Sequence, residues 1–279
     1  MPALSARSAR RSASRATALA VLAGLFALSN AMIIPTVNAQ QRNPLQTIGE
    51  TVADRASAHY RFERFTLSSV DGSRTWRVHI GIPRTAAPEQ GFPSFWMLDG
   101  NGALMEFDDA LVAELAQQAR PQVLVFIGYD NELRIDSAAR SRDYTPELTP
   151  DDQHDTTTHP LTGGADAFLD VIERRIRPEI ERRATLDPGQ RTLWGHSLGG
   201  LFVLHTLYTR TGAFQTYASG SPSMWWQNGL AVREGERFIT HNAGHPARVL
   251  IHLGGAERIG DRGQRDMSNP RVVAHLERG

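Results

Sequence analysis

Runs of apolar residues separated by polar turns divide the chain from residue 59 onward into short elements. Residues 59–69 and 74–83 have the pattern of two strands, and Asp71-Gly72 between them is a hairpin turn signal. Residues 122–129 form a nearly continuous apolar run, which is typical of a strand that is buried on both faces of a parallel sheet. Shorter runs predict further strands at residues 93–98, 191–194, 214–218 and 248–253.

Apolar residues at helical spacing lie between these strands and predict helices at residues 103–119, 166–183 and 198–208. The polar segments 99–102 and 130–160 are predicted to be loops, the second of a length that is uncommon unless the loop is functional or disordered. Strands that alternate with helices form right-handed crossovers. We therefore predict an α/β fold, with a mostly parallel twisted sheet, helices on both faces and an antiparallel edge. There is no internal repeat and no sign of a second domain.

The first 39 residues have the pattern of an N-terminal export signal. Arginines precede an apolar stretch at residues 17–28, and Val37-Asn38-Ala39 fits a signal-peptidase site. This stretch is too short and interrupted for a membrane span. We predict a signal peptide at residues 1–39, a single domain at residues 40–279, and a periplasmic or secreted protein without a stable membrane span. An uncleaved anchor or a disordered tail is the alternative, and Arg10-Arg11 fits a twin-arginine signal poorly.

Composition excludes several classes of function. The 279 residues carry a formal net charge of +0, so there is no electrostatic reason to expect nucleic-acid binding. The absence of cysteine rules out disulfides, thiol nucleophiles and thiolate metal sites. His154, Asp155 and His159 could hold a metal, but a polar loop of this composition is usually only solvated. We predict no metal and no cofactor.

The strongest chemical signal is Gly195-His196-Ser197-Leu198-Gly199, a G-x-S-x-G motif between a predicted strand and a predicted helix. A serine on such a tight turn needs neighbours without a Cβ, and Gly195 and Gly199 are expected to meet that need. The turn would raise the Ser197 hydroxyl above the carboxyl edge of the sheet and place the Leu198 N–H beside a developing oxyanion. Ser197 is therefore the predicted nucleophile of a serine hydrolase.

A second oxyanion donor is expected in the loop after an earlier strand. Asp99-Gly100-Asn101-Gly102 ends the strand at residues 93–98, on the same sheet edge as Ser197. We therefore predict an oxyanion hole made by the backbone N–H groups of Leu198 and of the Gly100–Gly102 segment, Gly100 and Asn101 in particular.

Several motifs of the chain occur in the same order in a known family. They are Met97 to Asn101, Gly128-Tyr129, Arg140 to Pro146, Gly163 to Phe168, Trp194 to Leu201 and Ser219 to Trp226. With them, residues 59–257 resemble the esterase-D-like group of α/β hydrolases, and most of all its periplasmic trilactone-siderophore esterases. The resemblance implies an α/β-hydrolase fold, Ser197 as nucleophile and an ester substrate, for which a ferric siderophore is one candidate.

The resemblance also implies residues that bind the substrate. It places Arg140 against an acidic or catecholate part of the substrate. A guanidinium can bind two anionic oxygens through bidentate hydrogen bonds. The alternative for Arg140 is a solvated loop charge. Trp225 and Trp226 would line an aromatic acyl or catechol pocket, or would belong to the core instead.

A serine hydrolase of this fold carries its acid and its histidine after the serine in sequence. Glu257 follows the last predicted strand at the usual acid position, with Asp261 as a second candidate. The family would continue with a helix, a final strand and a loop that bears the histidine. Residues 269–278 have the pattern of that helix, so the last strand and its histidine loop are predicted to be missing. The candidate histidines in the rest of the chain are His196, His205, His241, His245, His252 and His275. None of them is expected to be the base.

Three functions therefore stay open at this point. The first is hydrolysis of a carboxylic ester through Ser197. The second is acyl transfer to another acceptor on the same fold. The third is ligand binding by a homologue that is catalytically impaired, because loss of the base would leave at most the catalysis by the oxyanion hole.

Overall fold

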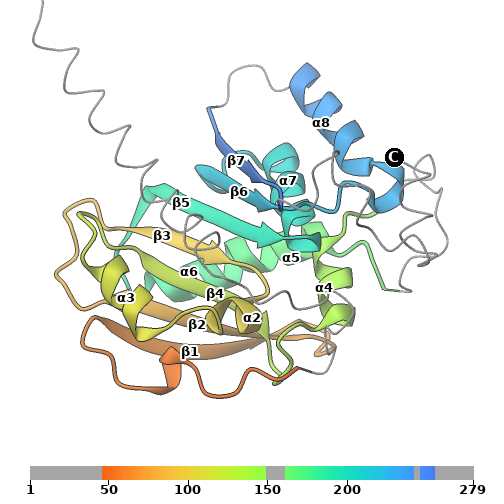
Figure 1. Ribbon diagram of the computed structural model, residues 1–279. Coiled ribbons are helices and arrows are strands. Elements are labelled where there is room, and N and C mark those ends of the chain that lie inside the picture. The colour runs from red at the N-terminus through yellow and green to blue at the C-terminus, as the bar shows by residue number, and fades with distance from the viewer. Residues whose placement is uncertain (1–45, 149–160, 242–245, 255–279) are drawn as a thin grey trace, which may run out of the picture. The chain divides into compact units, whose positions relative to one another are not determined.

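The computed structural model describes residues 46–148, 161–241 and 246–254, all of which belong to the unit Pro44–Gly279. A seven-stranded sheet lies at its centre, in the order β1-β2-β4-β3-β5-β6-β7 (Figure 1). The strands are β1 Tyr60–Ser68, β2 Thr75–Pro83, β3 Phe92–Met97, β4 Val123–Tyr129, β5 Leu186–His196, β6 Thr216–Gly220 and β7 Arg248–His252. The predicted signal peptide and the predicted loss of the last strand concern residues outside the described ranges.

The strand directions confirm the predicted sheet. β2 pairs antiparallel with both β1 and β4, whereas the other neighbours are parallel. All seven residues of β4 are buried, as the continuous apolar run predicted. Because β3, β4, β5, β6 and β7 run parallel, their carboxyl ends meet at one edge of the sheet.

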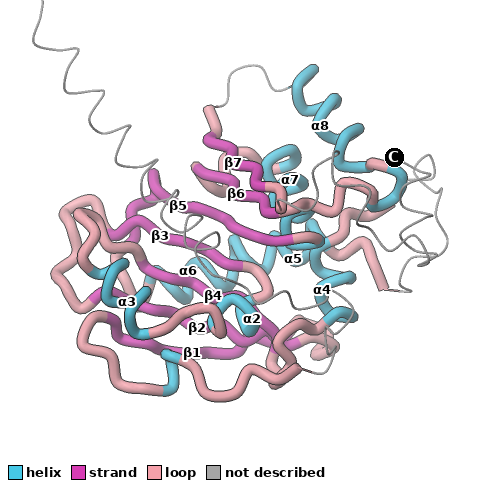
Figure 2. The backbone as a smooth tube through the Cα atoms, viewed as in Figure 1, coloured by secondary structure: helices cyan, strands magenta, loops and turns pink. Residues whose placement is uncertain are grey.

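Helices cover both faces of this sheet, as Figure 2 shows in cyan. They are α2 Gly100–Leu104, α3 Asp109–Ala116, α4 Ser137–Tyr144, α5 Ala165–Val171, the π-helical turn η4 Ile172–Ile176, α6 Arg177–Glu181, α7 Leu198–Thr209 and α8 Leu230–His241, with short 3₁₀ turns η2 Val52–Asp54 and η5 Trp226–Asn228. On one face, Phe168 of α5 stacks on Trp76 of β2 with ring centroids 5.8 Å apart. On the other, Phe107 meets Phe126 of β4 edge to face at 5.0 Å.

The structure corrects the helix predictions in three places, one of which is α8, which was not predicted. The single helix expected at residues 103–119 is two helices, and Gly100–Gly102, expected in a loop, belong to α2. The predicted loop at residues 130–160 contains α4, whose N-terminus is capped by the Asp136 side chain accepting from the Ala139 N–H. The helix expected at residues 166–183 is confirmed as α5, η4 and α6. Its π turn ends two residues before Pro178, which cannot donate the regular helical hydrogen bond.

Among the helices of the described residues, none combines the length and the apolar character that crossing a bilayer requires.

A buried histidine joins three of the helices. His205 of α7 is 3% exposed and contacts a carboxylate from each of two neighbouring helices. Its Nδ1 lies 2.9 Å from Glu234 Oε1 on α8, and its Nε2 lies 3.4 Å from Asp166 Oδ1 on α5. Burial alone would lower the pKa of His205, but the hydrogen bonds and charges of Asp166 and Glu234 raise it to about 9.

This contact predicts a pH dependence of stability. Because the folded-state pKa lies above the unfolded value of about 6.5, the protonated His205 stabilises the fold fully below pH 6.5. That contribution is lost as the pH rises toward 9. The difference in free energy of unfolding between the wild type and His205→Gln should therefore shrink between pH 6.5 and 9, in urea titrations at each pH. His59→Gln, at an exposed position, serves as the control. A difference that stays constant with pH would contradict the assignment.

Candidate active site

Ser197 stands alone on the turn between β5, which ends at His196, and α7, which begins at Leu198. Its φ of 59° and ψ of −117° lie outside the regions that side-chain-bearing residues prefer. The backbone is held there from both sides. The Ser197 N–H donates to the Gly220 carbonyl of β6 at 2.9 Å, and the Ser223 N–H donates to the Ser197 carbonyl at 3.1 Å. The side chain is half-buried, as a nucleophile that must meet a substrate requires.

Of the two glycines of the motif, the structure constrains one as predicted and leaves the other unconstrained. A Cβ on Gly195 would lie 2.4 Å from the Gly199 carbonyl oxygen, so this position requires glycine, as predicted. A Cβ on Gly199 would meet its nearest neighbour at 3.6 Å, an ordinary contact, so the prediction for Gly199 is wrong. Gly200 is instead the second constrained position, because its Cβ would lie 2.9 Å from the Gly220 carbonyl oxygen. The close approach of α7 to β6 thus falls at Gly200 and not at Gly199.

Backbone strain is concentrated at this edge of the sheet. The non-glycine residues with positive φ in the described part of the chain are Asp99, Ser197, Ser221, Gln227 and Asn228. They follow the carboxyl ends of β3, β5 and β6. Each such residue costs on the order of 1–3 kcal/mol, and such residues cluster at active sites and ligand clamps. The distribution of strain therefore marks the same edge as the serine motif.

The hydroxyl of Ser197 lies against a second serine. Its Oγ is 3.2 Å from the Oγ of Ser223, which is 3% exposed and belongs to the segment after β6. Ser223 was not singled out by the sequence, because a serine in a polar segment carries no signal of its own. A hydroxyl can orient the nucleophile, but it is too weak a base to activate it.

The predicted oxyanion residues lie at the starts of two helices. Gly100 packs so closely on β4 that a Cβ would lie 2.5 Å from the Phe126 carbonyl carbon. The Asn101 side chain turns toward the segment after β4, where its Nδ2 donates to the carbonyl oxygens of Tyr129, Asn131 and Leu133. Only the backbone of Asn101 can therefore serve the site. Gly100, Asn101 and Leu198 all lie in first helical turns, whose N–H groups have no acceptor within the helix.

Arg140 reaches this edge from α4. Its Nε and Nη2 each donate to one oxygen of the Asp99 carboxylate at 2.9 Å, and Nη2 also donates to the His196 carbonyl at 3.1 Å. The side chains of Arg140 and Asp99 are 13% and 11% exposed. The predicted contact with a substrate stays a prediction, but Arg140 is not a solvated loop charge. It already holds a carboxylate of the protein.

Trp225 and Trp226 differ in burial. Trp226 is 3% exposed and packs with Leu201 and Leu230, which is the core packing considered as the alternative. Trp225 is 54% exposed and is therefore the one that can meet a ligand.

Of the remaining candidate acids, histidines and metal ligands, the structure describes only some. Glu257, Asp261, His245, His275 and the possible metal ligands of residues 154–159 lie outside the described residues, as does the His241 side chain. His205 is held between two carboxylates away from Ser197. His252 is the last residue of β7, and its carbonyl accepts from the Ser221 N–H at 2.7 Å.

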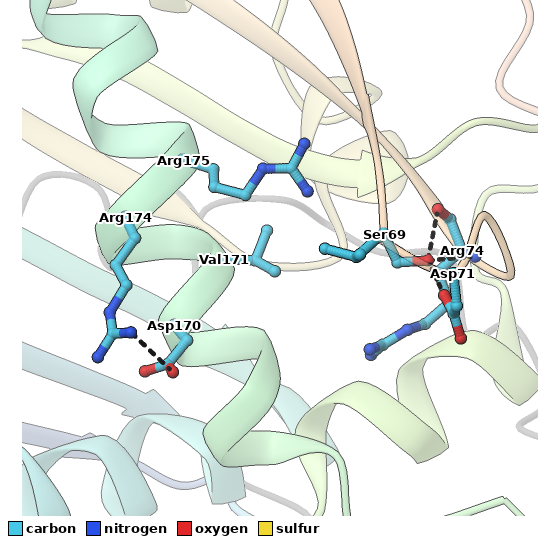
Figure 3. A pocket seen from close by; sticks show the side chains of 8 residues that line it. Ser69, Asp71, Arg74, Asp170, Val171, Arg174 and Arg175 are labelled. Carbon is cyan, nitrogen blue, oxygen red and sulfur yellow. Dashed lines mark hydrogen bonds and ion pairs between the residues drawn. The ribbon is translucent and has the colours of Figure 1, made fainter.

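A surface hollow of about 420 Å³ lies elsewhere on the molecule. Figure 3 shows its lining by the β1–β2 turn and by α5 and η4, with the side chains of Ser69, Val70, Asp71, Arg74, Asp170, Val171, Arg174 and Arg175. β1 is four strands from β5 in the sheet, roughly 20 Å at the usual strand spacing. The hollow is therefore separate from the serine site.

The sheet order, the antiparallel β2 and the serine on a strained strand-to-helix turn together define an α/β hydrolase. The predicted fold class is thereby confirmed, and a crystal structure with the same architecture supports it. The BES protein from Bacillus cereus has a TM-score of 0.63 and 31% sequence identity to this chain, over 80% of both chains.

Within that class, residues 69–268 match the family described as "Putative esterase", and the chain belongs to this family. Apo-salmochelin esterase of Escherichia coli O6:H1 is 37% identical over 201 residues, which are 71% of this chain and 63% of that protein. The match thus spans less than two thirds of that relative. Ferri-bacillibactin esterase BesA of Bacillus subtilis is 34% identical over 201 residues, 69% of either protein. These relatives confirm the resemblance to siderophore esterases that the motifs indicated.

The glycine geometry predicts a large effect for one alanine variant and a small effect for another. Gly195→Ala should lower the free energy of unfolding by about 3 kcal/mol, because the new methyl group forces α7 away from β5. Gly199→Ala should change it by no more than about 1 kcal/mol, since its Cβ finds space and alanine favours the helix. Urea unfolding followed by tryptophan fluorescence measures both values. Equal losses in the two variants would show that the turn is not built as described.

Proposed function

We propose that this chain is a serine esterase that hydrolyses the ester bonds of a lactone siderophore. The observation that carries the proposal is Ser197, held in a strained conformation between β5 and α7 at the edge where the other strained residues gather. The names of the relatives support the substrate class, since both are esterases of siderophores. The proposed location is the periplasm or the exterior, on the strength of the signal-peptide pattern in residues 1–39.

The proposed chemistry proceeds in two steps through an acyl-enzyme. The Ser197 Oγ attacks the ester carbonyl carbon and loses its proton, and the carbonyl oxygen becomes an oxyanion. The N–H groups of Gly100, Asn101 and Leu198 are the proposed donors to it. The C–O bond then breaks, and the alcohol leaves with the proton that Ser197 lost. Water next attacks the acyl-enzyme: its OH becomes part of the released acid, and its other proton returns to the Ser197 Oγ.

The other site residues of the proposal bind the substrate or hold the acid position. Glu257 is the proposed acid, the residue that in this fold orients the histidine base, although no histidine of this chain is assigned that role. Trp225, which is 54% exposed, offers an aromatic face to a catechol ring. Arg140 is the candidate for an anionic oxygen of the ligand, in addition to its bond to Asp99.

A binding protein without turnover is the second candidate function. The observation that favours it is that, within the described ranges, the contact of the Ser197 Oγ is with the hydroxyl of Ser223. A serine without a base would keep the ligand site and lose most of the rate.

Hydrolysis of a catecholate trilactone, with and without bound iron, separates the two candidates. The wild type should open the ring to linear esters, as measured by liquid chromatography and mass spectrometry. Ser197→Ala should reduce the rate by at least about 10³-fold, because the nucleophile is lost. Ser73→Ala, in the exposed β1–β2 turn, should leave the rate unchanged. If the wild type quenches its tryptophan fluorescence on binding but forms no product, the chain is a binder and the esterase proposal is wrong.

A further inference from the structure

Asp99 is the N-cap residue of α2, yet its side chain does not cap the helix. An N-cap aspartate with extended backbone ordinarily accepts from the second or third N–H of the helix, whereas Asp99 is left-handed, with a φ of 50° and a ψ of 45°. Here both carboxylate oxygens accept from Arg140 instead, each at 2.9 Å. The carboxylate therefore does not accept from the N–H groups of Asn101 and Gly102, and Asn101 is one of the donors that the proposed mechanism assigns to the oxyanion.

Arg140 also connects Asp99 to the nucleophile turn. Its Nη2 donates to the His196 carbonyl at 3.1 Å, across 56 positions of the sequence. His196 directly precedes Ser197, and Asp99 directly precedes Gly100. The guanidinium therefore joins the two backbone segments that supply the proposed oxyanion donors.

A second residue of α4 supports the same arrangement. Tyr144 is fully buried, and its hydroxyl oxygen accepts from the Asp99 N–H at 2.8 Å. The Arg140 guanidinium carbon lies 5.6 Å from the centre of the Tyr144 ring. Asp99, with a φ of 50°, is thus held at both its backbone N–H and its carboxylate.

The charge of Asp99 also matters for catalysis. A Cβ on Gly199 would lie 3.7 Å from the Asp99 Oδ2, so the carboxylate is beside the nucleophile turn. An unpaired negative charge there would oppose the negative charge that develops on the ester oxygen. The paired guanidinium neutralises it.

We propose that Arg140 is a positioning residue, which keeps the Asp99 carboxylate out of the oxyanion hole and fixes the two backbone segments that form it. This inference rests on the proposed function. It assigns Arg140 a role in every ester hydrolysis at this site, whereas a contact with the substrate would matter only for anionic substrates.

Two small esters separate the two roles of Arg140: neutral p-nitrophenyl acetate and the anionic p-nitrophenyl hemisuccinate. Arg140→Gln should lower kcat about 100-fold for both esters, with little change in KM, because misplaced or blocked oxyanion donors cost roughly that much. Arg134→Gln removes an exposed ion pair with Glu106 and should leave both rates unchanged. A loss confined to the anionic ester would overturn the proposal.

The double variant gives the sharpest readout. If the released carboxylate blocks the oxyanion hole, Asp99→Asn in the Arg140→Gln background should restore kcat about 10-fold, because the blocking charge is gone. A double variant that is no faster than Arg140→Gln alone would contradict this role of Asp99.

Amide hydrogen exchange tests the inference even if the wild type hydrolyses neither ester, which would count against the proposed function alone. Arg140→Gln should slow exchange at Asn101 and Gly102, because the freed carboxylate accepts their N–H groups, and the double variant should reverse this. Unchanged exchange at these residues, measured by NMR in folded protein, would overturn the proposed withholding of the carboxylate.

Discussion

The hydrogen bond from the Ser197 N–H to the Gly220 carbonyl fixes the point on which the rest of the site depends. It holds a serine at a φ of 59°, a conformation that costs on the order of 1–3 kcal/mol and that an isolated turn would not keep. The bond is available only because β5 and β6 are parallel and end together. Gly195 and Gly200 then allow α7 to approach the sheet closely enough to start at the next residue.

α4 supplies several buried polar contacts near this point. Arg140 and Tyr144 hold Asp99 at the end of β3. Asp143 of the same helix is fully buried and accepts from the Trp76 indole at 2.7 Å and from the Arg74 guanidinium at 2.6 Å. Burial raises the pKa of Asp143, although both partners act to lower it. One short helix thus links β2, β3 and the nucleophile turn, and its contacts place the proposed oxyanion donors relative to Ser197.

The sequence predicted the parts of this arrangement that depend on local pattern. The buried β4, the antiparallel edge and the serine between a strand and a helix each have a signature within a few residues. α4 escaped prediction because its sequence has few apolar residues, and its contacts come from buried polar side chains. The cap at Asp136 was the signal that could have found it.

Contacts between residues far apart in the sequence could not be predicted, because they leave no local pattern. The partner of Arg140 is 41 positions away, and no periodicity reports which carboxylate a guanidinium will meet. The constraint on Gly200, and not on Gly199, arises from β6, which no local pattern in the motif reveals. The Asn101 side chain was likewise committed to the segment after β4 by the packing of α2 on that strand.

The central claim is that the fold makes Ser197, among all the serines of the chain, a reactive nucleophile. Labelling with a fluorophosphonate, followed by peptide mass spectrometry, tests this claim most directly. The account predicts one adduct, on Ser197, that forms rapidly in the folded chain and does not form in urea, where the strained turn is lost. No adduct on the folded chain, or labelling of another serine at the same rate, would contradict it.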